Sequence, residues 1–561
     1  MIRATFAGFN TALSALQANQ KRLDITGQNL ANMNTKGYTR QTLETSSLNY
    51  TGPVSHYMNG SELVVGFGVA MDKVTQIRDP FLDAQYRAQM EKSGYTNAMQ
   101  TSLDSLSRVL DESSIAGIRQ AFDNIQTVLS DLQDPAKIHD KVYESELRAK
   151  MESLTNLLNL SAQKIDEARK QEYERLDGEG TNQNGAEQNV NDILKRIGEL
   201  NRQIKHNQIF GQQSLELMDE RNVLLDELSS YVPIEVRYKK DDAHKDDKDW
   251  PDDLYVDMVY YKDDGTKTSL SLVSGTEGAA NQNYGSVEMV RTPADSYLNV
   301  TAKFTSAPIS AGGDVVISGS DTVPKGNEFN GGSIQSGLDM LSGEAVTKPV
   351  DIEQVDVHGY QYYMNHLDNL AQSFATVMNE LNNLGNANVA GAPADSPLMV
   401  NRNDGTKTNI TASSIGINTD WANGKVSLGK GIADDGNNAN DTVLAMLGAM
   451  SVFYQGQGAG TPPTRPGFGV DLGNKTFASY ISNVSTVLAT DSSSNQASLK
   501  TDVTVLNGIQ NSRDSVSGIS LDEEASNMMT YLAAYNAASR LMTTLDEALN
   551  TLINNTGLVG R

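Results

Sequence analysis

The sequence predicts an elongated α+β multidomain protein in which the N- and C-terminal helices pair in a coiled-coil-like way. Both ends of the 561-residue chain carry apolar residues at seven-residue spacing. Inside these ends lie helical stretches, and these in turn enclose β-rich runs with turn residues between them. In this nested pattern, the first half of the chain is expected to run along the long axis of the molecule and the second half to run back along it. The two termini would then lie at the same end.

Apolar stripes are the feature that the two ends share. The first segment carries Phe9, Leu13, Leu16, Leu23 and Leu30. The last segment carries Leu521, Met528, Tyr535, Met542 and Leu549, with Ala525, Leu532, Leu545 and Leu552 on the same side. Such narrow stripes are typical of paired helices. The alternative is two separate amphipathic helices docked on a globular body, since heptads this short also occur in ordinary bundles.

Local signals mark where the terminal helices end and begin. The stretch "GQNLANMNTKGYTRQ" (27–41) interrupts the first helix with Asn, Thr and Gly, and Gly37 is expected to have a positive φ. Ser520 is predicted to cap the last helix, with Glu523 completing a capping box.

The middle of the chain is predicted to be mainly helical in three pieces, 61–232, 331–395 and 470–514, between terminal pieces 1–60 and 515–561. Helix dominates from about 93 to 231, returns at about 346–386, and forms the last elements from about 474. Two helical faces are apolar: one has Ile115, Ile118, Phe122, Ile125, Leu129 and Leu132, and the other has Leu367, Leu370, Phe374, Val377, Met378 and Leu381.

Two insertions are predicted to be β-rich. Residues 233–330 contain runs such as "LYVDMVYY" and "TSLSLV", and "KDDGTKT" between them signals a hairpin because Asp-Gly supplies positive-φ residues. Residues 396–469 are expected to form a second small β-rich insertion and a linker, with "NDGTKT" as another turn. The first insertion is expected to be an antiparallel domain.

Composition excludes several classes of function. The formal charge of −25 argues against nucleic acid or an anionic membrane as the main partner. The chain has no cysteine, hence no disulfides and no thiolate ligands. The N-terminus is mixed in polarity and does not resemble a cleaved signal peptide, and no apolar run is long enough to span a membrane.

No motif for catalysis or metal binding is found, so we predict a non-enzyme without cofactor, metal or catalytic residues. The six histidines include no H-E-x-x-H pair, and neither a phosphate-binding loop nor a G-x-S-x-G elbow occurs. His358 and His366 are expected to be packed or solvated. The carboxylate-rich stretches 241–253 and 433–441 lack the spacing of a calcium loop and are expected to be solvated loops.

Several stretches resemble proteins of the bacterial flagellar axis. At the N-terminus these are Asn29, Leu30, Asn32, Thr35, Gly37 and Tyr38 of "NLANMNTKGYTRQ"; at the C-terminus the stretch is "VSGISLDEEASNMMTYLAAYN". Internal stretches, including "ELMDERNVLLDELSSYVPIEV" and "HLDNLAQSFATVMNELNNLG", resemble the hook-associated proteins that join hook and filament. The 233–330 region shows no such resemblance, and "MNELNNLGNANVAG" lacks a histidine that the family carries near this point.

The resemblance implies a structural role outside the cell. The chain would be exported through the flagellar type III apparatus without a cleaved signal and would form a ring between hook and filament. Its partners would be neighbouring copies, the hook protein, the second junction protein, flagellin indirectly, and an export chaperone on the C-terminal helix. The terminal stripes and the N-terminal signature residues would then be assembly residues.

Alternatives remain open at this point. The chain could be another axial protein, namely the second junction protein, a hook protein or flagellin. It could also be a flagellin with a protease inserted, or a flagellar stem that carries an adhesive β module.

Overall fold

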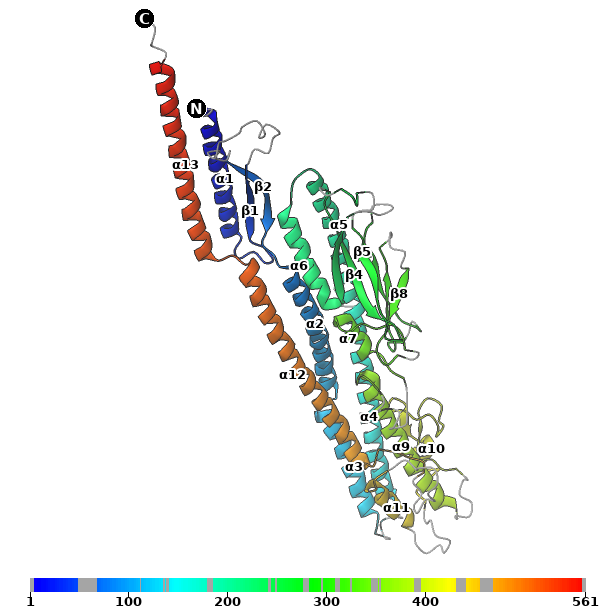
Figure 1. Cartoon of the computed structure of the whole chain (residues 1–561). Coiled ribbons are helices and arrows are strands. Elements are labelled where there is room, and N and C mark those ends of the chain that lie inside the picture. Colours follow the sequence, from blue (N-terminus) through cyan, green and yellow to red (C-terminus); the bar gives the residue numbers. More distant parts are fainter. Residues whose placement is uncertain are drawn as a thin grey trace.

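The protein is an elongated α+β molecule with both termini at one end, as the sequence predicts (Figure 1). The computed structural model describes residues 5–48, 68–110, 112–134, 137, 141–178, 185–240, 244–247, 250–275, 282–293, 296–307, 313–322, 325–344, 352, 355–387, 395–429, 440–454 and 468–556.

Helices α1 (Thr5–Ala31) and α13 (Leu521–Thr556) form the terminal end and lie antiparallel (Figure 1). The Arg22 guanidinium lies 5.6 Å from the centre of the Tyr531 ring, and Leu545 packs beside Gly8. These contacts confirm that the terminal helices pair. Beside them lies a two-stranded antiparallel hairpin of β1 (Gln41–Ser47) and β2 (Val69–Gln76). The sequence does not predict this hairpin, because neither strand alternates clearly between apolar and polar residues.

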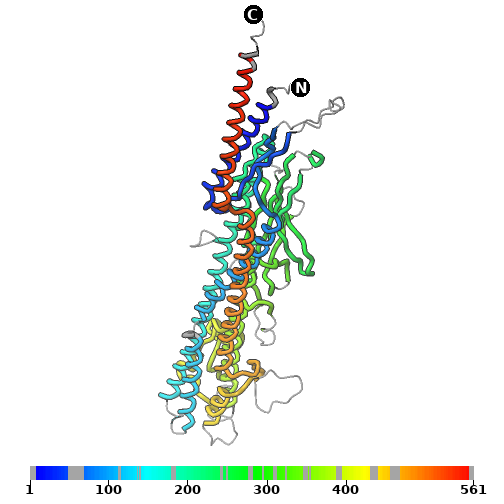
Figure 2. Tube along the Cα trace, turned by 60° about the vertical axis from the view of Figure 1, so that its left-hand side comes forward, coloured from blue at the N-terminus to red at the C-terminus, as the bar shows by residue number. Residues whose placement is uncertain are grey.

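A long helical shaft follows, in which α2 (Pro80–Val109) and α12 (Phe477–Ser517) run side by side (Figure 2). Helix α2 starts earlier than the predicted onset near residue 93, because the Asp79 side chain accepts a hydrogen bond from the Phe81 N–H (2.9 Å) and Pro80 fits the first helical turn. The other helices of the middle part are α3 (Glu112–Asp131), α4 (Lys141–Asp177), α5 (Ala186–Ile209), α6 (Leu215–Tyr231), α7 (Ser333–Met340) and α9 (Tyr360–Ala387).

The core of the shaft is held by the predicted apolar faces, all of whose members are buried. Three rings join α3, α9 and α12: the centroid of Phe122 lies 5.3 Å from that of Phe374 and 5.8 Å from that of Phe477. Phe374 and Phe477 are 5.4 Å apart and meet edge to face. This aromatic cluster fixes the distal end of α12 on the helices beneath it.

The 233–330 region is an antiparallel β unit, as predicted. One sheet has the order β3 (Ile234–Lys239), β4 (Asp253–Tyr261), β5 (Lys267–Val273), and the other has β6 (Ser286–Val290), β7 (Thr301–Thr305), β8 (Asp314–Ile317). Gly265 has a φ of +78° in the β4–β5 turn, which confirms the hairpin signal. Helix α5 packs on this unit through β5 and β6.

Some other expectations are wrong. In the described parts of the 396–469 region (396–429, 440–454 and 468–469) there are two short strands, β9 (Met399–Asn401) and β10 (Ile415–Ile417), and the helices α10 (Thr419–Ala422) and α11 (Asp441–Met450). Helix α11 packs on α3 and α9 because its apolar sequence completes their core. Helix α9 begins at Tyr360, and the predicted helix onset near 346 lies outside the described residues. Asp253 lies at the end of the supposed solvated loop 241–253, yet it is buried and pairs with Lys205 (3.0 Å).

Glu187 couples the β unit to α5 in a pH-dependent way. Its carboxylate accepts a hydrogen bond from the Met289 N–H (2.7 Å), and burial, with Asp177 and Glu288 nearby, raises the pKa of Glu187 to about 7. Since the folded-state pKa lies above the ordinary value of 4.5, the stability contributed by protonated Glu187 is complete below about pH 4.5 and is lost as the pH rises towards 7.

Glu187→Gln should therefore raise the thermal unfolding midpoint at about pH 8 but not at pH 4.5, because glutamine stays neutral and can still accept the Met289 hydrogen bond. Circular dichroism melts at the two pH values measure this. Glu146→Gln, on the exposed surface of α4, is the matched control and should show no such difference. An equal shift of the Glu187→Gln midpoint at both pH values would contradict this account.

Candidate functional site

The surface that α1 buries differs from the predicted apolar stripe. Apart from Ile25, its most buried side chains are small or polar and belong to Ala12, Ala18, Asn19, Thr26 and Asn29. Of the predicted stripe, Phe9, Leu16, Leu23 and Leu30 are only half-buried, and Leu13 is 46% exposed. The predicted stripe is therefore only partly buried within the single chain. Helix α13 approaches α1 closely at Gly8, where a Cβ would lie 3.4 Å from the Leu545 side chain.

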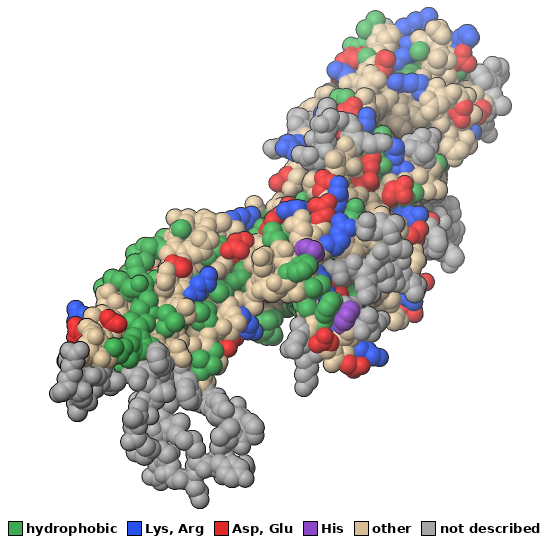
Figure 3. Space-filling model, turned by 90° about the horizontal axis from the view of Figure 1, so that it is seen from above, with side chains coloured by type: hydrophobic (Ala, Val, Ile, Leu, Met, Phe, Trp, Pro, Cys, Tyr) green, Lys and Arg blue, Asp and Glu red, His purple; other side chains and the backbone are tan. Residues whose placement is uncertain are grey.

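Helix α13 shows the same division. Met528, Tyr535, Met542, Leu545 and Leu549 are half-buried. The side chains of Leu521, Leu532 and Leu541 are about half exposed. Those of Met529 and Ile553 are more exposed still. The Leu552 side chain lies outside the described residues. Apolar side chains therefore gather on the surface of this end of the molecule (Figure 3).

Asn29 fixes the chain where it leaves α1. Its side-chain oxygen accepts a hydrogen bond from the Gln41 N–H, and its side-chain N–H donates to the Gln41 carbonyl, both at 3.0 Å. The amide thus pairs with the outer edge of β1 as a neighbouring strand would. The Tyr38 hydroxyl also donates to the Asn29 oxygen (3.2 Å). Burial, together with the nearby carboxylates of Glu216, Asp219 and Glu524, raises the pKa of Tyr38 to about 12.

The rest of the signature forms the turn. The Asn32 side chain donates to the Gln28 carbonyl (3.0 Å), and the exposed Thr35 hydroxyl donates to the Asn32 side-chain oxygen (3.3 Å). Gly37 has a φ of +81°, which confirms the sequence prediction. A Cβ at Gly37 would lie 2.2 Å from Val223 of α6, so both backbone conformation and space require glycine.

The next residues attach this turn to α6 and α13. Asp219 accepts hydrogen bonds from the Thr39 N–H (3.0 Å) and hydroxyl (2.7 Å). Arg40 pairs with Glu523 (2.7 Å) and with the buried Glu524 (2.8 Å). The capping-box expectation is therefore wrong in its second half, because Glu523 binds Arg40, and Ser520 Oγ lies 3.5 Å from the Glu523 N–H.

A second group of charges ties α12 to α2 and α6. Arg513 bridges Asp83 (3.0 Å) and Asp226 (2.7 Å), and Asp226 also pairs with Arg87 (2.9 Å). Arg78 pairs with Asp83 (2.5 Å). All five side chains are mostly buried. The sequence alone does not predict that these five side chains form a group. The only signal was that "ELMDERNVLLDELSS", quoted for its resemblance, contains Asp226 as well as Asp219.

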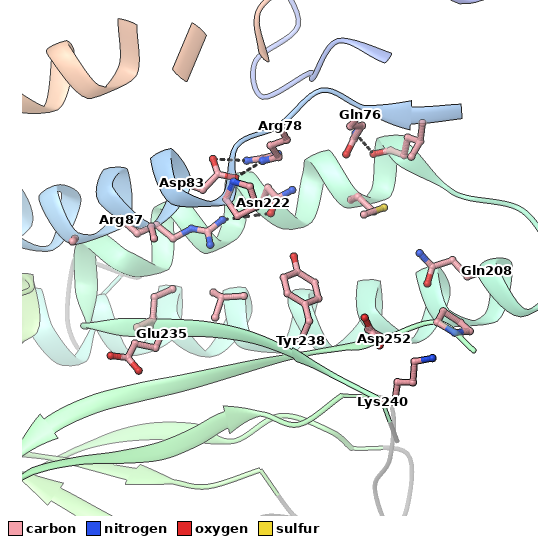
Figure 4. A pocket seen from close by; sticks show the side chains of 18 of the residues that line it. Gln76, Arg78, Asp83, Arg87, Gln208, Asn222, Glu235, Tyr238, Lys240 and Asp252 are labelled. Carbon is pink, nitrogen blue, oxygen red and sulfur yellow. Dashed lines mark hydrogen bonds and ion pairs between the residues drawn. The ribbon is translucent and has the colours of Figure 1, made fainter. Parts of the chain in front are cut away.

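A cleft of about 1200 Å³ lies next to this junction, between α2 and α6 on one side and β3 on the other (Figure 4). Arg78, Asp83 and Arg87 line it near the hairpin, and Tyr238 points into it from β3. Burial raises the pKa of Glu91, at the far end of the cleft, to about 6. In the described part of the chain, no group of three or more histidine and acidic side chains could hold a metal ion.

The two histidines considered in the sequence have structural roles. His358 Nδ1 lies 2.7 Å from Asp491 of α12, and the buried His366 ring lies 2.6 Å from the Tyr480 hydroxyl. Burial lowers the pKa of His366 to about 3, so it is neutral near pH 7. None of the described helices combines the length and apolar character needed to cross a bilayer.

The family models and the relatives that match this chain are all flagellar proteins. Family models match the flagellar hook-associated protein FlgK helical domain at 103–394, the flagella basal body rod protein at 9–39, and the flagellar basal body rod FlgEFG protein C-terminal region at 510–555. The chain is 28% identical over 562 residues to flagellar hook-associated protein 1 of Bacillus subtilis (strain 168), with 100% of both chains covered.

Other similarities are partial. Flagellar hook-associated protein 1 of Salmonella typhimurium is 30% identical over 232 residues, which is 40% of this chain and 38% of that protein. A solved structure, the flagellar hook junction protein FlgK from Burkholderia pseudomallei, matches with a TM-score of 0.37 and 18% identity over 56% of this chain and 46% of that one.

Gly37→Ala tests the turn. The substitution should destabilise the junction by more than the roughly 1–2 kcal/mol of a left-handed non-glycine residue, because Val223 must also move. Gly27→Ala in α1, where a Cβ meets no neighbour within 4 Å, is the matched control and should stabilise by about 0.5–1 kcal/mol. Amide hydrogen exchange across residues 29–41 provides the measurement. Unchanged protection in Gly37→Ala would refute the constraint.

Proposed function

Since the chain belongs to the FlgK family of flagellar hook-associated proteins and is thus a structural protein of the flagellar axis, we propose that it forms the junction ring between hook and filament. The observation that carries the proposal is the match of the FlgK helical domain across 103–394, in the middle of the chain. Matches to rod-type terminal regions on both sides support an axial position.

The terminal helices are the proposed assembly surface. Leu13, Leu521 and Leu532 are each about half exposed, although they lie on helices that already pair within the chain. Exposed apolar side chains that lie together on a surface mark a place that a partner covers. Neighbouring copies would cover it in the ring, and a chaperone would cover the C-terminal helix before export.

A junction subunit would also have a defined export route, location and set of neighbours. The subunit would leave the cell through the flagellar type III apparatus without a cleaved signal peptide and reside in the extracellular flagellum. The hook protein would lie on one side of the ring, and the second junction protein, with flagellin beyond it, on the other. The role would be structural, without catalysis or a cofactor.

Deletion of the gene tests the junction role. Cells should carry bare hooks and release unpolymerised flagellin, because filament growth would lack its adaptor. Electron microscopy of cells and immunoblots of the culture medium provide the readout. Intact filaments on the deletion strain would refute the proposal, and expression of the wild-type chain from a plasmid controls for effects on neighbouring genes.

The double variant Leu532→Asp, Met542→Asp tests the terminal surface. Two carboxylates on α13 should block incorporation, because an uncompensated charge in an apolar contact costs several kcal/mol. The middle part should stay folded, as α13 packs mainly on α1. Leu160→Asp, at a 48% exposed leucine of α4, is the matched control. Normal amounts of the double variant in purified hook–filament structures would contradict the assignment.

A further inference from the structure

The outer edge of β3 presents unused main-chain groups. The Val259 N–H of β4 donates to the Pro233 carbonyl (3.0 Å), so Pro233 and Val259 face each other as a hydrogen-bonded pair. In an antiparallel ladder such pairs alternate with non-bonded ones. The amides and carbonyls of Ile234, Val236 and Tyr238 therefore point away from β4.

The same rule can be checked on β1 and β2. There the Ile77 N–H donates to the Arg40 carbonyl (2.8 Å), which predicts that the main chain of Gln41 points outwards. Asn29 binds the Gln41 N–H and carbonyl from the outside, as that assignment requires. The register rule therefore identifies outward-facing groups correctly in this protein.

The outward edge of β3 faces the cleft. Ile234, Val236 and Tyr238 all line it, and Tyr238 is 57% exposed (Figure 4). Within the described ranges, no main-chain group from another element bonds to these three residues. By contrast, the opposite edge of the sheet is occupied, since the Gly285 N–H and the Ala307 N–H donate to carbonyls of β5.

The walls of the cleft suit a polypeptide rather than a small ion. Three of its cations are paired with carboxylates: Arg78 with Asp83, Arg87 with Asp226, and Lys267 with Glu235. On the opposite wall, Ala84 and Ala88 of α2 are small and leave room beside the strand. The matching chemistry is therefore an extended main chain, which supplies donors and acceptors in alternation.

We propose that β3 accepts an extended segment of a second copy of this chain as an additional strand of the β3–β4–β5 sheet. The inference rests on the proposed ring, in which every subunit has a neighbouring copy on either side in the plane of the ring. Helices α2 and α6, which line the cleft, lie midway along the molecule (Figure 1), and in such a ring a neighbouring copy would lie alongside this part. Arg237 and Lys239 are exposed on β3 and discourage indiscriminate strand pairing in the free chain.

The test uses a photocrosslinking benzoylphenylalanine in place of Tyr238, in the full chain and in cells. After irradiation of purified hook–filament structures, we expect a crosslinked dimer whose linked peptides both map to this chain. A chain that is present in these structures but forms no dimer, or that crosslinks to a different protein, would overturn the inference. Absence of the chain from the structures would overturn the ring itself and the inference with it.

A second variant isolates the main-chain contact. Val236→Pro removes an N–H that faces the cleft and leaves the ladder to β4 intact, so crosslinked dimer should fall about tenfold. Val236→Thr keeps the N–H and is the matched control, with dimer yield near that of the parent. Circular dichroism melts of both variants report whether the fold is retained. Equal crosslinking in both folded variants would overturn the strand pairing, and if Val236→Pro does not fold, the Tyr238 crosslink decides alone.

Discussion

The constraint on which the molecule depends is the attachment of the terminal helix pair to the shaft. Two connections join these parts, one between β2 and α2 and the other between α12 and α13. Two short links alone would leave the angle between the parts undefined. Asp219 of α6 binds Thr39 beside the first connection, and Arg40 reaches across to Glu523 and Glu524 beside the second.

The charges at this junction add little to the free energy of unfolding. Their main effect is to favour one relative arrangement of the helices that they join. Surface ion pairs contribute about 0–1 kcal/mol, whereas removal of one partner of a buried pair costs about 3–5 kcal/mol, because the remaining charge stays desolvated. Arg513 bridges two buried carboxylates from two different helices, so α2, α6 and α12 cannot shift independently without exposing an unpaired charge. A specified geometry suits a subunit that must fit its neighbours.

The sequence predicts some levels of this structure better than others. The faces around Phe122 and Phe374 are predicted because a 3.6-residue period reports burial directly, and the β4–β5 turn is predicted because Asp-Gly demands a particular backbone. The β1–β2 hairpin has no such pattern. The sequence predicts apolar stripes on the terminal helices, yet Leu13 and Leu532 remain exposed in the single chain. An apolar stripe shows that a helix face can be buried, but not whether the same chain or another one buries it. The contacts of Asp219 and Arg513 join residues distant in sequence, and no local pattern reports them.

Helix α12 has a mechanical consequence. Its 41 residues form one uninterrupted helix about 60 Å long, held at one end by the Phe477 ring and at the other by Arg513. An α-helix is stiff along its axis, since every turn is braced by its own hydrogen bonds. A twisting or pulling force applied to the terminal helices would therefore be transmitted along the axis of α12. It would reach the distal aromatic cluster largely without deforming the β sheets, which lie to one side of that path.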